Sequence, residues 1–180
     1  QYFRSKGLKT GDHIALIIEN NKRFYEVCWG AHRCGLYFTA ISTRLTAPEA
    51  AYIVNDCGAR LVVTTKAMAE VATGLLGETP DVETFLMMDG VVGGYESYED
   101  AVAPMPAERI GDETSGTDML YSSGTTGRPK GIKIALTGEP IEYTSPQRQA
   151  VRMLYGFDEN TVYLSPAPLY HAAPLHYNIM

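Results

Sequence analysis

Cysteine is scarce in this sequence, with three residues among 180, and an odd number cannot be fully paired in internal disulfides. A chain of this length has room for a sizeable hydrophobic core, so it needs no disulfide framework in order to fold. Cys28 and Cys34 lie near His32, but their spacing matches none of the common zinc patterns. We therefore expect buried, free cysteines and no metal ligands at this cluster.

Positive charge is also limited, because 15 Lys and Arg residues stand against 21 Asp and Glu residues and give a formal net charge of -6. This balance disfavours nucleic acids and anionic membrane surfaces as partners, since both bind basic patches. No apolar run approaches the ~18 residues of a membrane span, and the first residues lack a secretory signal pattern. These features predict a cytoplasmic protein and say nothing of its oligomeric state.

Short apolar runs alternate with helical patterns in the first half of the chain. The runs typical of buried strands occupy residues 13–18, 36–42, 60–65 and 83–88. Helical patterns fill the intervals at residues 21–34, 46–57 and 66–76. The second helix opens with a capping box, Thr46-Ala47-Pro48-Glu49. Strands that alternate with helices in this way predict right-handed crossovers and a doubly wound α/β fold, with helices flanking a parallel sheet.

Glycines and prolines gather after the fourth strand and interrupt this alternation. We interpret residues 1–102 as a first, incomplete α/β subdomain and residues 103–117 as a connector. Residues 118–180 are then a strand pair with a glycine-rich loop and the start of a next, incomplete α/β subdomain.

Two further elements are predicted near the end of the chain. Ser145-Pro146 is a typical helix start, and Gly156 is a typical stop. Met153 and Leu154 lie on the expected apolar face of that helix. Residues 161–165 are predicted to form a strand.

The stretch with the strongest functional signal is Ser122-Ser123-Gly124-Thr125-Thr126-Gly127-Arg128-Pro129-Lys130-Gly131, followed by an alternating run at residues 132–136. This pattern predicts a strand, a glycine-rich loop and a second strand. Glycines let backbone N–H groups approach a ligand, the hydroxyl side chains add donors, and Lys130 adds one positive charge. The loop is therefore suited to a polyphosphate. It differs from the common P-loop, in which the lysine is followed by Ser or Thr at the start of a helix.

A loop of this composition without any ligand is the alternative. With each residue type at roughly 6% usage, a sequence matches seven fixed positions of a motif by chance on the order of once in several hundred million starting points. This low frequency argues against the alternative. The stretch resembles the AMP-binding signature of the acyl-adenylate-forming enzymes, a superfamily that includes acyl-CoA synthetases, peptide-synthetase adenylation domains and firefly-type luciferases. The resemblance implies that the β- and γ-phosphates of ATP are bound by Ser122, Ser123, Gly124, Thr125, Thr126, Gly127 and Lys130.

A second segment, residues 166–175, carries three prolines within nine residues, which predicts a rigid connector at the end of a strand. Ligands of open α/β sheets bind at that end. Its run Pro168-Leu169-Tyr170-His171-Ala172-Ala173-Pro174-Leu175 resembles a second motif of the same family. The resemblance implies that His171 lies near the substrate carboxylate and shapes access for the thiol acceptor. The alternative is a histidine that only packs in a turn, and His176 matches no role.

The resemblance extends to two segments that look like acyl-CoA synthetases in particular. They are Gly7-Leu8-Lys9-Thr10-Gly11-Asp12, and Arg44-Leu45-Thr46-Ala47-Pro48-Glu49 through Asp56-Cys57-Gly58-Ala59-Arg60. It implies the large N-terminal domain of an enzyme that activates a carboxylic acid, expected to be a fatty acid, with ATP and Mg²⁺. The acyl-AMP is then transferred to coenzyme A. Two alternatives remain, an adenylation domain that loads a carrier protein and a non-catalytic nucleotide-binding module.

Gln1 is not a start methionine and Met180 falls inside an apolar segment, so we expect a fragment of a longer protein. The resemblance implies that the adenine-binding segment, the main Mg²⁺ ligand and a catalytic lysine follow residue 180. The 180-residue chain alone is therefore expected to be inactive and to bind ATP weakly.

Overall fold

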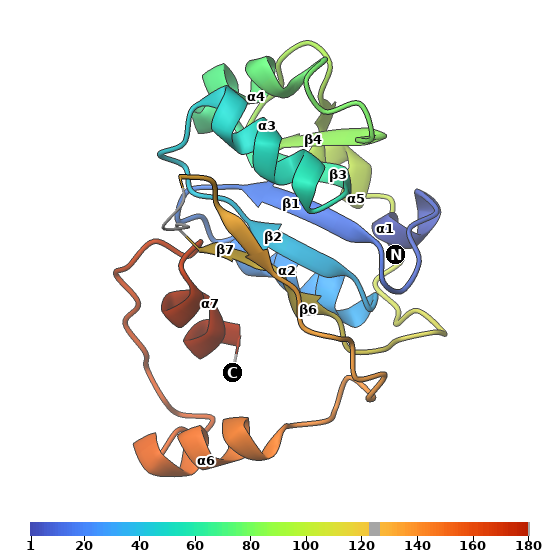
Figure 1. Cartoon of the computed structure of the whole chain (residues 1–180). Coiled ribbons are helices and arrows are strands. Elements are labelled where there is room, and N and C mark those ends of the chain that lie inside the picture. Colours follow the sequence, from blue (N-terminus) through green and yellow to red (C-terminus); the bar gives the residue numbers. More distant parts are fainter. Residues whose placement is uncertain (123–126, 180) are drawn as a thin grey trace.

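The structure is a computed structural model that describes residues 1–122 and 127–179 (Figure 1). Among these residues, six strands form one sheet in the order β5-β4-β3-β1-β2-β6, and every neighbouring pair is parallel. The strands are β1 (His13–Ile17), β2 (Tyr37–Ala40), β3 (Ala59–Thr65), β4 (Thr84–Met88), β5 (Glu96–Ser97) and β6 (Thr117–Asp118). Helices cover both faces of the sheet, so the predicted doubly wound α/β fold is confirmed.

The helices of the first face share one apolar core with the sheet. They are α1 (Tyr2–Ser5), α2 (Phe24–Arg33), α5 (Tyr98–Val102) and α7 (Ala172–Ile179). The second face is covered by the short 3-10 helix η1 (Lys66–Met68), α3 (Ala47–Asp56) and α4 (Ala69–Leu75). Helix α6 (Pro146–Tyr155) lies away from the sheet (Figure 1). No helix in the described part of the chain is long and apolar enough to cross a membrane.

Burial explains why the central strands are recognisable in the sequence. All five residues of β1 are buried, and Ile14 and Leu16 belong to the first-face core whereas Ala15 and Ile17 belong to the second. A strand covered on both faces needs a continuous apolar run. The predicted strands accordingly coincide with β1, β3 and β4 to within one residue, and β2 is shorter than predicted.

The predicted capping box begins α3. The backbone N–H and the hydroxyl of Thr46 both donate to the Glu49 carboxylate, at 2.8 and 2.7 Å, and these bonds lower the pKa of Glu49. Helix α2 begins at Phe24, three residues later than predicted. The Asn21 side-chain oxygen accepts a hydrogen bond from the Arg23 backbone N–H at 2.9 Å and holds the chain in a turn before the helix.

Two predictions for residues 145–165 are wrong. Residues 161–165 form no strand, and Val162 and Leu164 are 98% and 83% exposed. An alternating pattern does not form a strand where no neighbouring strand supplies hydrogen bonds. Helix α6 forms as predicted, but Met153 and Leu154 on its expected apolar face are 83% and 76% exposed and do not pack on a core.

The proline-rich segment is also more regular than predicted. Helix α7 begins at Ala172 and includes Pro174, so residues 172–175 are helical and the predicted rigid connector does not extend over them. Pro174 lies in the first turn, where a missing N–H group breaks no intrahelical hydrogen bond. The helix carries Leu175 and Ile179 into the first-face core.

Strand β6 adds to the sheet a strand that the sequence pattern does not predict, because the first α/β subdomain is predicted to end at residue 102. Thr117 pairs with Tyr37 of β2, and Asp118 pairs with Phe38. The sheet therefore includes the last residue of the predicted connector. A two-residue strand has no apolar run that would reveal it in the sequence.

Cys28, Cys34 and Cys57 are free and buried, as predicted. Burial raises the pKa of all three thiols, that of Cys57 to about 11, so they remain protonated at neutral pH. The His32 Nδ1 donates to the Gly116 carbonyl oxygen at 2.5 Å. Within residues 1–122 and 127–179, no three His, Cys, Asp or Glu side chains are grouped as metal ligands.

Candidate functional site

The predicted phosphate loop connects two short antiparallel strands, β7 (Leu120–Ser122) and β8 (Lys130–Ile132). Ser122 and Lys130 are opposite each other in the register, and both are exposed. Directly opposed residues of an antiparallel pair project from the same face, so the hydroxyl and the ammonium group share the mouth of the loop. The prediction of two strands around the loop is confirmed, but the second strand is misplaced: β8 begins at Lys130, and of the alternating run at residues 132–136 only Ile132 belongs to a strand. Four of the predicted binding residues lie outside the described residues: Ser123, Gly124, Thr125 and Thr126.

The glycines that flank Lys130 have different physical roles. Gly127 has a φ of +94°, a conformation that favours glycine. At Gly131, a Cβ atom would lie 2.4 Å from Met119 Cε and 2.9 Å from Tyr121 Cζ. Gly131 therefore allows β8 to pass closely over the side chains of the opposite strand.

Helix α3 supports both arms of this hairpin. The Tyr52 hydroxyl donates to the Pro129 carbonyl oxygen at 3.3 Å, and the Arg128 guanidinium lies 5.5 Å from the centre of the Tyr52 ring. The Tyr121 hydroxyl donates to Asp56 Oδ2 at 2.5 Å, and burial together with this carboxylate raises the pKa of Tyr121. The sequence predicts no contact with the loop for Tyr52 or Asp56, and only their spacing of four on one helix hints at a shared role.

The chain that leaves β8 is fastened to the sheet. Lys133 Nζ lies 2.8 Å from His13 Nε2 and 4.5 Å from the centre of the Tyr37 ring, and the Tyr37 hydroxyl donates to the Ile134 carbonyl oxygen at 2.8 Å. Burial, followed by the charge of Lys133, lowers the pKa of His13 to about 4. His13 is therefore neutral at pH 7, and its Nε2 accepts the hydrogen bond from Lys133.

His171 lies at the start of α7. Its side chain is exposed, and its ring centre is 4.6 Å from that of Tyr170. Its backbone N–H donates to the Pro168 carbonyl oxygen at 3.1 Å, and its own carbonyl accepts from the Leu175 N–H at 3.0 Å. Leu169 and Leu175 on either side are buried in the first-face core. The imidazole thus reaches solvent from a backbone that is anchored at two points.

The two predicted motifs are connected through His176, for which the sequence gives no role. His176 Nε2 lies 3.0 Å from Oδ1 of Asp118, the last residue of β6 and four residues before Ser122. This contact joins the helix that follows His171 to β6, and β6 precedes β7, the strand that leads into the loop.

This pair has a pH dependence that can be measured. The hydrogen bond to Asp118 is the main cause that raises the pKa of His176 above 6.5. A raised folded-state pKa contributes stability that is fully present below pH 6.5 and is lost as the pH rises through the raised value. We expect an NMR titration of the His176 imidazole to give a midpoint above 6.5 and Asp118→Asn to lower it. An unchanged midpoint in the variant would show that the pair does not form.

The fold and the site together define a parallel α/β protein with a glycine-rich loop on a hairpin beside the sheet. The sequence model of the AMP-binding enzyme family matches residues 1–180. The chain therefore belongs to that family.

Curated relatives match most of this chain. The long-chain-fatty-acid–CoA ligase FadD13 of Mycobacterium tuberculosis is 29% identical over 94% of this chain and 32% of its own length. A crotonobetaine/carnitine–CoA ligase of a Proteus species is 28% identical over 94% of this chain and 33% of its own. The fatty acid–[acyl-carrier-protein] ligase ScoC of Streptomyces coeruleorubidus is 29% identical over 73% of this chain and 25% of its own. The chain spans about a third of the length of the first two.

Solved structures share the fold. The N-terminal domain of FACL13 from Mycobacterium tuberculosis superposes with a TM-score of 0.73 at 24% identity, over 98% of this chain and 43% of that one. The anthranilate CoA ligase AuaEII, solved in complex with anthranoyl-AMP, superposes with a TM-score of 0.64 at 28% identity, over 73% of this chain and 26% of that one.

Proposed function

We propose that this chain is the phosphate-binding part of an AMP-forming acyl-CoA synthetase. The observation that carries the proposal is the position of Lys130 directly across from Ser122 at the mouth of a glycine-rich loop. Its context supports the proposal, because the family match covers the whole chain and the relatives are acid–thiol ligases by name.

The proposed reaction has two steps. A carboxylate oxygen attacks the α-phosphorus of ATP, the bond to the β-phosphate breaks, and acyl-AMP and pyrophosphate form. The sulfur of coenzyme A then attacks the acyl carbonyl carbon, and AMP leaves. Negative charge builds on the departing pyrophosphate, where Lys130, the hydroxyl of Ser122 and backbone N–H groups of the loop stabilise it. The same role is proposed for Ser123, Gly124, Thr125, Thr126 and Gly127.

The described residues do not offer a complete site for Mg²⁺. No three His, Cys, Asp or Glu side chains group together among them, and the sequence from Ser122 to Gly131 contains no carboxylate. We therefore assign no step to Mg²⁺ through this chain and propose that its main ligand follows residue 180. On the same ground, the 180-residue chain is proposed to form no acyl-AMP and to bind ATP weakly.

His171 is proposed to lie near the substrate carboxylate and the path of the thiol. A fatty acid is the proposed substrate, and coenzyme A the proposed acceptor. A carrier protein is the second candidate acceptor, because ScoC is by name an acyl-carrier-protein ligase. The same proposal includes the division of the chain into a first subdomain at residues 1–102, a connector at residues 103–117 and a second part at residues 118–180. It also includes a cytoplasmic location, where ATP and coenzyme A are both present.

Pyrophosphate release by the full-length protein tests the proposal. With ATP and a series of carboxylic acids, we expect release that depends on the acid, and AMP and acyl-CoA once coenzyme A is added. Acyl transfer to a carrier protein but not to coenzyme A would favour the second acceptor. ATP binding without acid-dependent release for any acid would favour a non-catalytic module, and adenylate formation by the 180-residue chain would contradict the proposed division of the site.

A further inference from the structure

Asn20 holds the segment that precedes His171. Its Nδ2 donates to the Ala167 carbonyl oxygen at 3.1 Å, and its Oδ1 accepts from the Leu169 backbone N–H at 2.9 Å. One side-chain amide therefore binds the backbone on both sides of Pro168, as the peptide group of a neighbouring parallel strand would. Ala167 and Leu169 follow Asn20 in the sequence by 147 and 149 residues. Two bonds from one planar group fix both the position and the direction of this segment.

The segment held by Asn20 also fixes the backbone of His171, which follows it directly in the sequence. The Leu169 side chain is buried in the first-face core, and the Pro168 carbonyl accepts the hydrogen bond from the His171 N–H at 3.1 Å. The Asn20 amide and the start of α7 are thus linked through the backbone of Pro168 and Leu169. A shift at Asn20 would move the point from which the imidazole projects.

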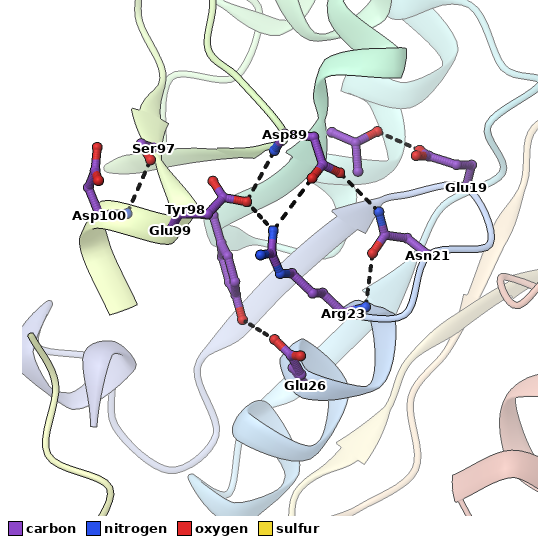
Figure 2. A network of polar contacts seen from close by, with 10 residues as sticks. Glu19, Asn21, Arg23, Glu26, Asp89, Ser97, Tyr98, Glu99 and Asp100 are labelled. Atoms are coloured by element: carbon purple, nitrogen blue, oxygen red, sulfur yellow. Dashed lines mark hydrogen bonds and ion pairs between the residues drawn. The ribbon is translucent and has the colours of Figure 1, made fainter. Parts of the chain in front are cut away.

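The two sequence neighbours of Asn20, Glu19 and Asn21, are each held by a polar contact (Figure 2). Glu19 accepts a hydrogen bond from the hydroxyl of Thr65 at the end of β3. On the other side, the Asn21 Nδ2 donates to Asp89 Oδ2 at 3.1 Å, directly after β4. The turn that bears Asn20 is therefore tied to the carboxyl ends of two other strands.

An ion pair completes this support. Arg23 pairs with Glu99 of α5, and its Nη1 lies 3.5 Å from Asp89 Oδ1 (Figure 2). Asp89 has a φ of +60°, an uncommon conformation for a non-glycine residue, which its three polar contacts stabilise. The carboxyl end of a parallel sheet is where ligands of this fold class bind.

We propose that Asn20 is a positioning residue for His171, and that the network around Glu19, Asn21, Arg23, Asp89 and Glu99 keeps it in place. The inference rests on the proposed function, since it concerns the same site. Asn20 does not touch the reacting atoms; it sets where His171 meets the substrate. Small displacements of a positioned group have large effects on rate.

A double-mutant cycle in the full-length protein tests this role. Rates of acyl-CoA formation are compared for the wild type, Asn20→Ala, His171→Ala and the double variant. We expect Asn20→Ala to lower kcat about ten-fold with the KM for ATP unchanged. If Asn20 acts through His171, its replacement costs nothing further in the His171→Ala background. Fully additive losses would overturn the proposal, because a general loss of stability acts equally in both backgrounds.

Two further variants separate positioning from folding. Asn20→Asp keeps the acceptor for Leu169 but loses the donor to Ala167, so its kcat is expected between those of the wild type and Asn20→Ala. Asn55→Asp is the matched control, since the Asn55 Nδ2 also donates to a distant backbone carbonyl, that of Glu78, at 2.8 Å but outside the site. Its kcat is expected to equal that of the wild type. An equal loss in Asn55→Asp would overturn the specific role of Asn20.

Hydrogen exchange provides a readout that does not depend on activity. In Asn20→Ala, the backbone N–H groups of Leu169 and His171 are expected to exchange faster than in the wild type, and those of β1 are not. Unchanged exchange at Leu169 would overturn the proposal even if the wild type activates no acid. An inactive wild type with this exchange pattern would instead contradict the proposed function and leave the structural link intact.

Discussion

Replacement of Lys130 by alanine in the full-length protein is expected to lower acid-dependent pyrophosphate release about 100- to 1,000-fold, the usual cost of removing a preorganised donor from a developing charge. Lys130 begins β8 opposite Ser122, where its ammonium group shares the mouth of the loop. Because the charge grows on the departing pyrophosphate, the loss is expected mainly in kcat. Steady-state kinetics with a coupled pyrophosphate assay measure it.

Lys133 is the matched control for this variant. It is also an exposed lysine of the segment after the loop, but its ammonium group binds His13 and lies over the Tyr37 ring, away from the mouth. Lys133→Ala is expected to leave kcat within about two-fold of the wild type, because the contacts that it removes are with His13 and Tyr37 and not with the loop. Equal losses in Lys130→Ala and Lys133→Ala would contradict the assignment of Lys130.

Gly116→Ala is expected to destabilise the protein by about 3 kcal/mol or more, at the high end for a single substitution. A Cβ atom at Gly116 would lie 2.3 Å from the Leu36 carbonyl oxygen and 2.7 Å from the Leu36 nitrogen. These are backbone atoms that cannot rotate away. Relief of the clash would also break the hydrogen bond from the Gly116 N–H to the His32 carbonyl oxygen, which is 2.7 Å long.

Urea unfolding measures this effect, with Gly111→Ala as the matched control. No atom lies within 4 Å of a Cβ built at Gly111, and its φ is not in the left-handed region. The control is expected to be neutral or to stabilise by about 0.4–1 kcal/mol through the unfolded chain. Similar unfolding midpoints for both variants would show that β6 does not dock against β2 in this way. Because β6 leads into β7, loss of this docking is also expected to slow adenylation.

The parallel sheet was predictable because its central strands are buried on both faces. That burial demands continuous apolar runs, and β1, β3 and β4 lie where those runs do. Strands β5 and β6 have two residues each and exist only through their neighbours, so no local pattern reveals them. The opposite error occurred at residues 161–165, which alternate as a strand does but have no described neighbour.

The candidate site was predictable only where a motif recurs across a family. Lys130 and His171 were identified in this way. The contacts of Asn20, Tyr52 and Asp56 were missed, because each is made with a segment 65 to 149 residues further along the chain. Neither the residue types nor their spacing distinguishes such residues in the sequence, and only the folded structure shows which distant segments they contact.

Isotope transfer from the acid to AMP is the most direct test of the proposed chemistry. The full-length protein is incubated with ATP, coenzyme A and a carboxylic acid labelled with ¹⁸O in both carboxylate oxygens. If the carboxylate attacks the α-phosphorus and the thiol then displaces AMP, one labelled oxygen appears in the AMP, and the other stays in the acyl-CoA. Label in inorganic phosphate together with ADP, or no label in AMP despite acyl-CoA formation, would contradict an acyl-adenylate pathway.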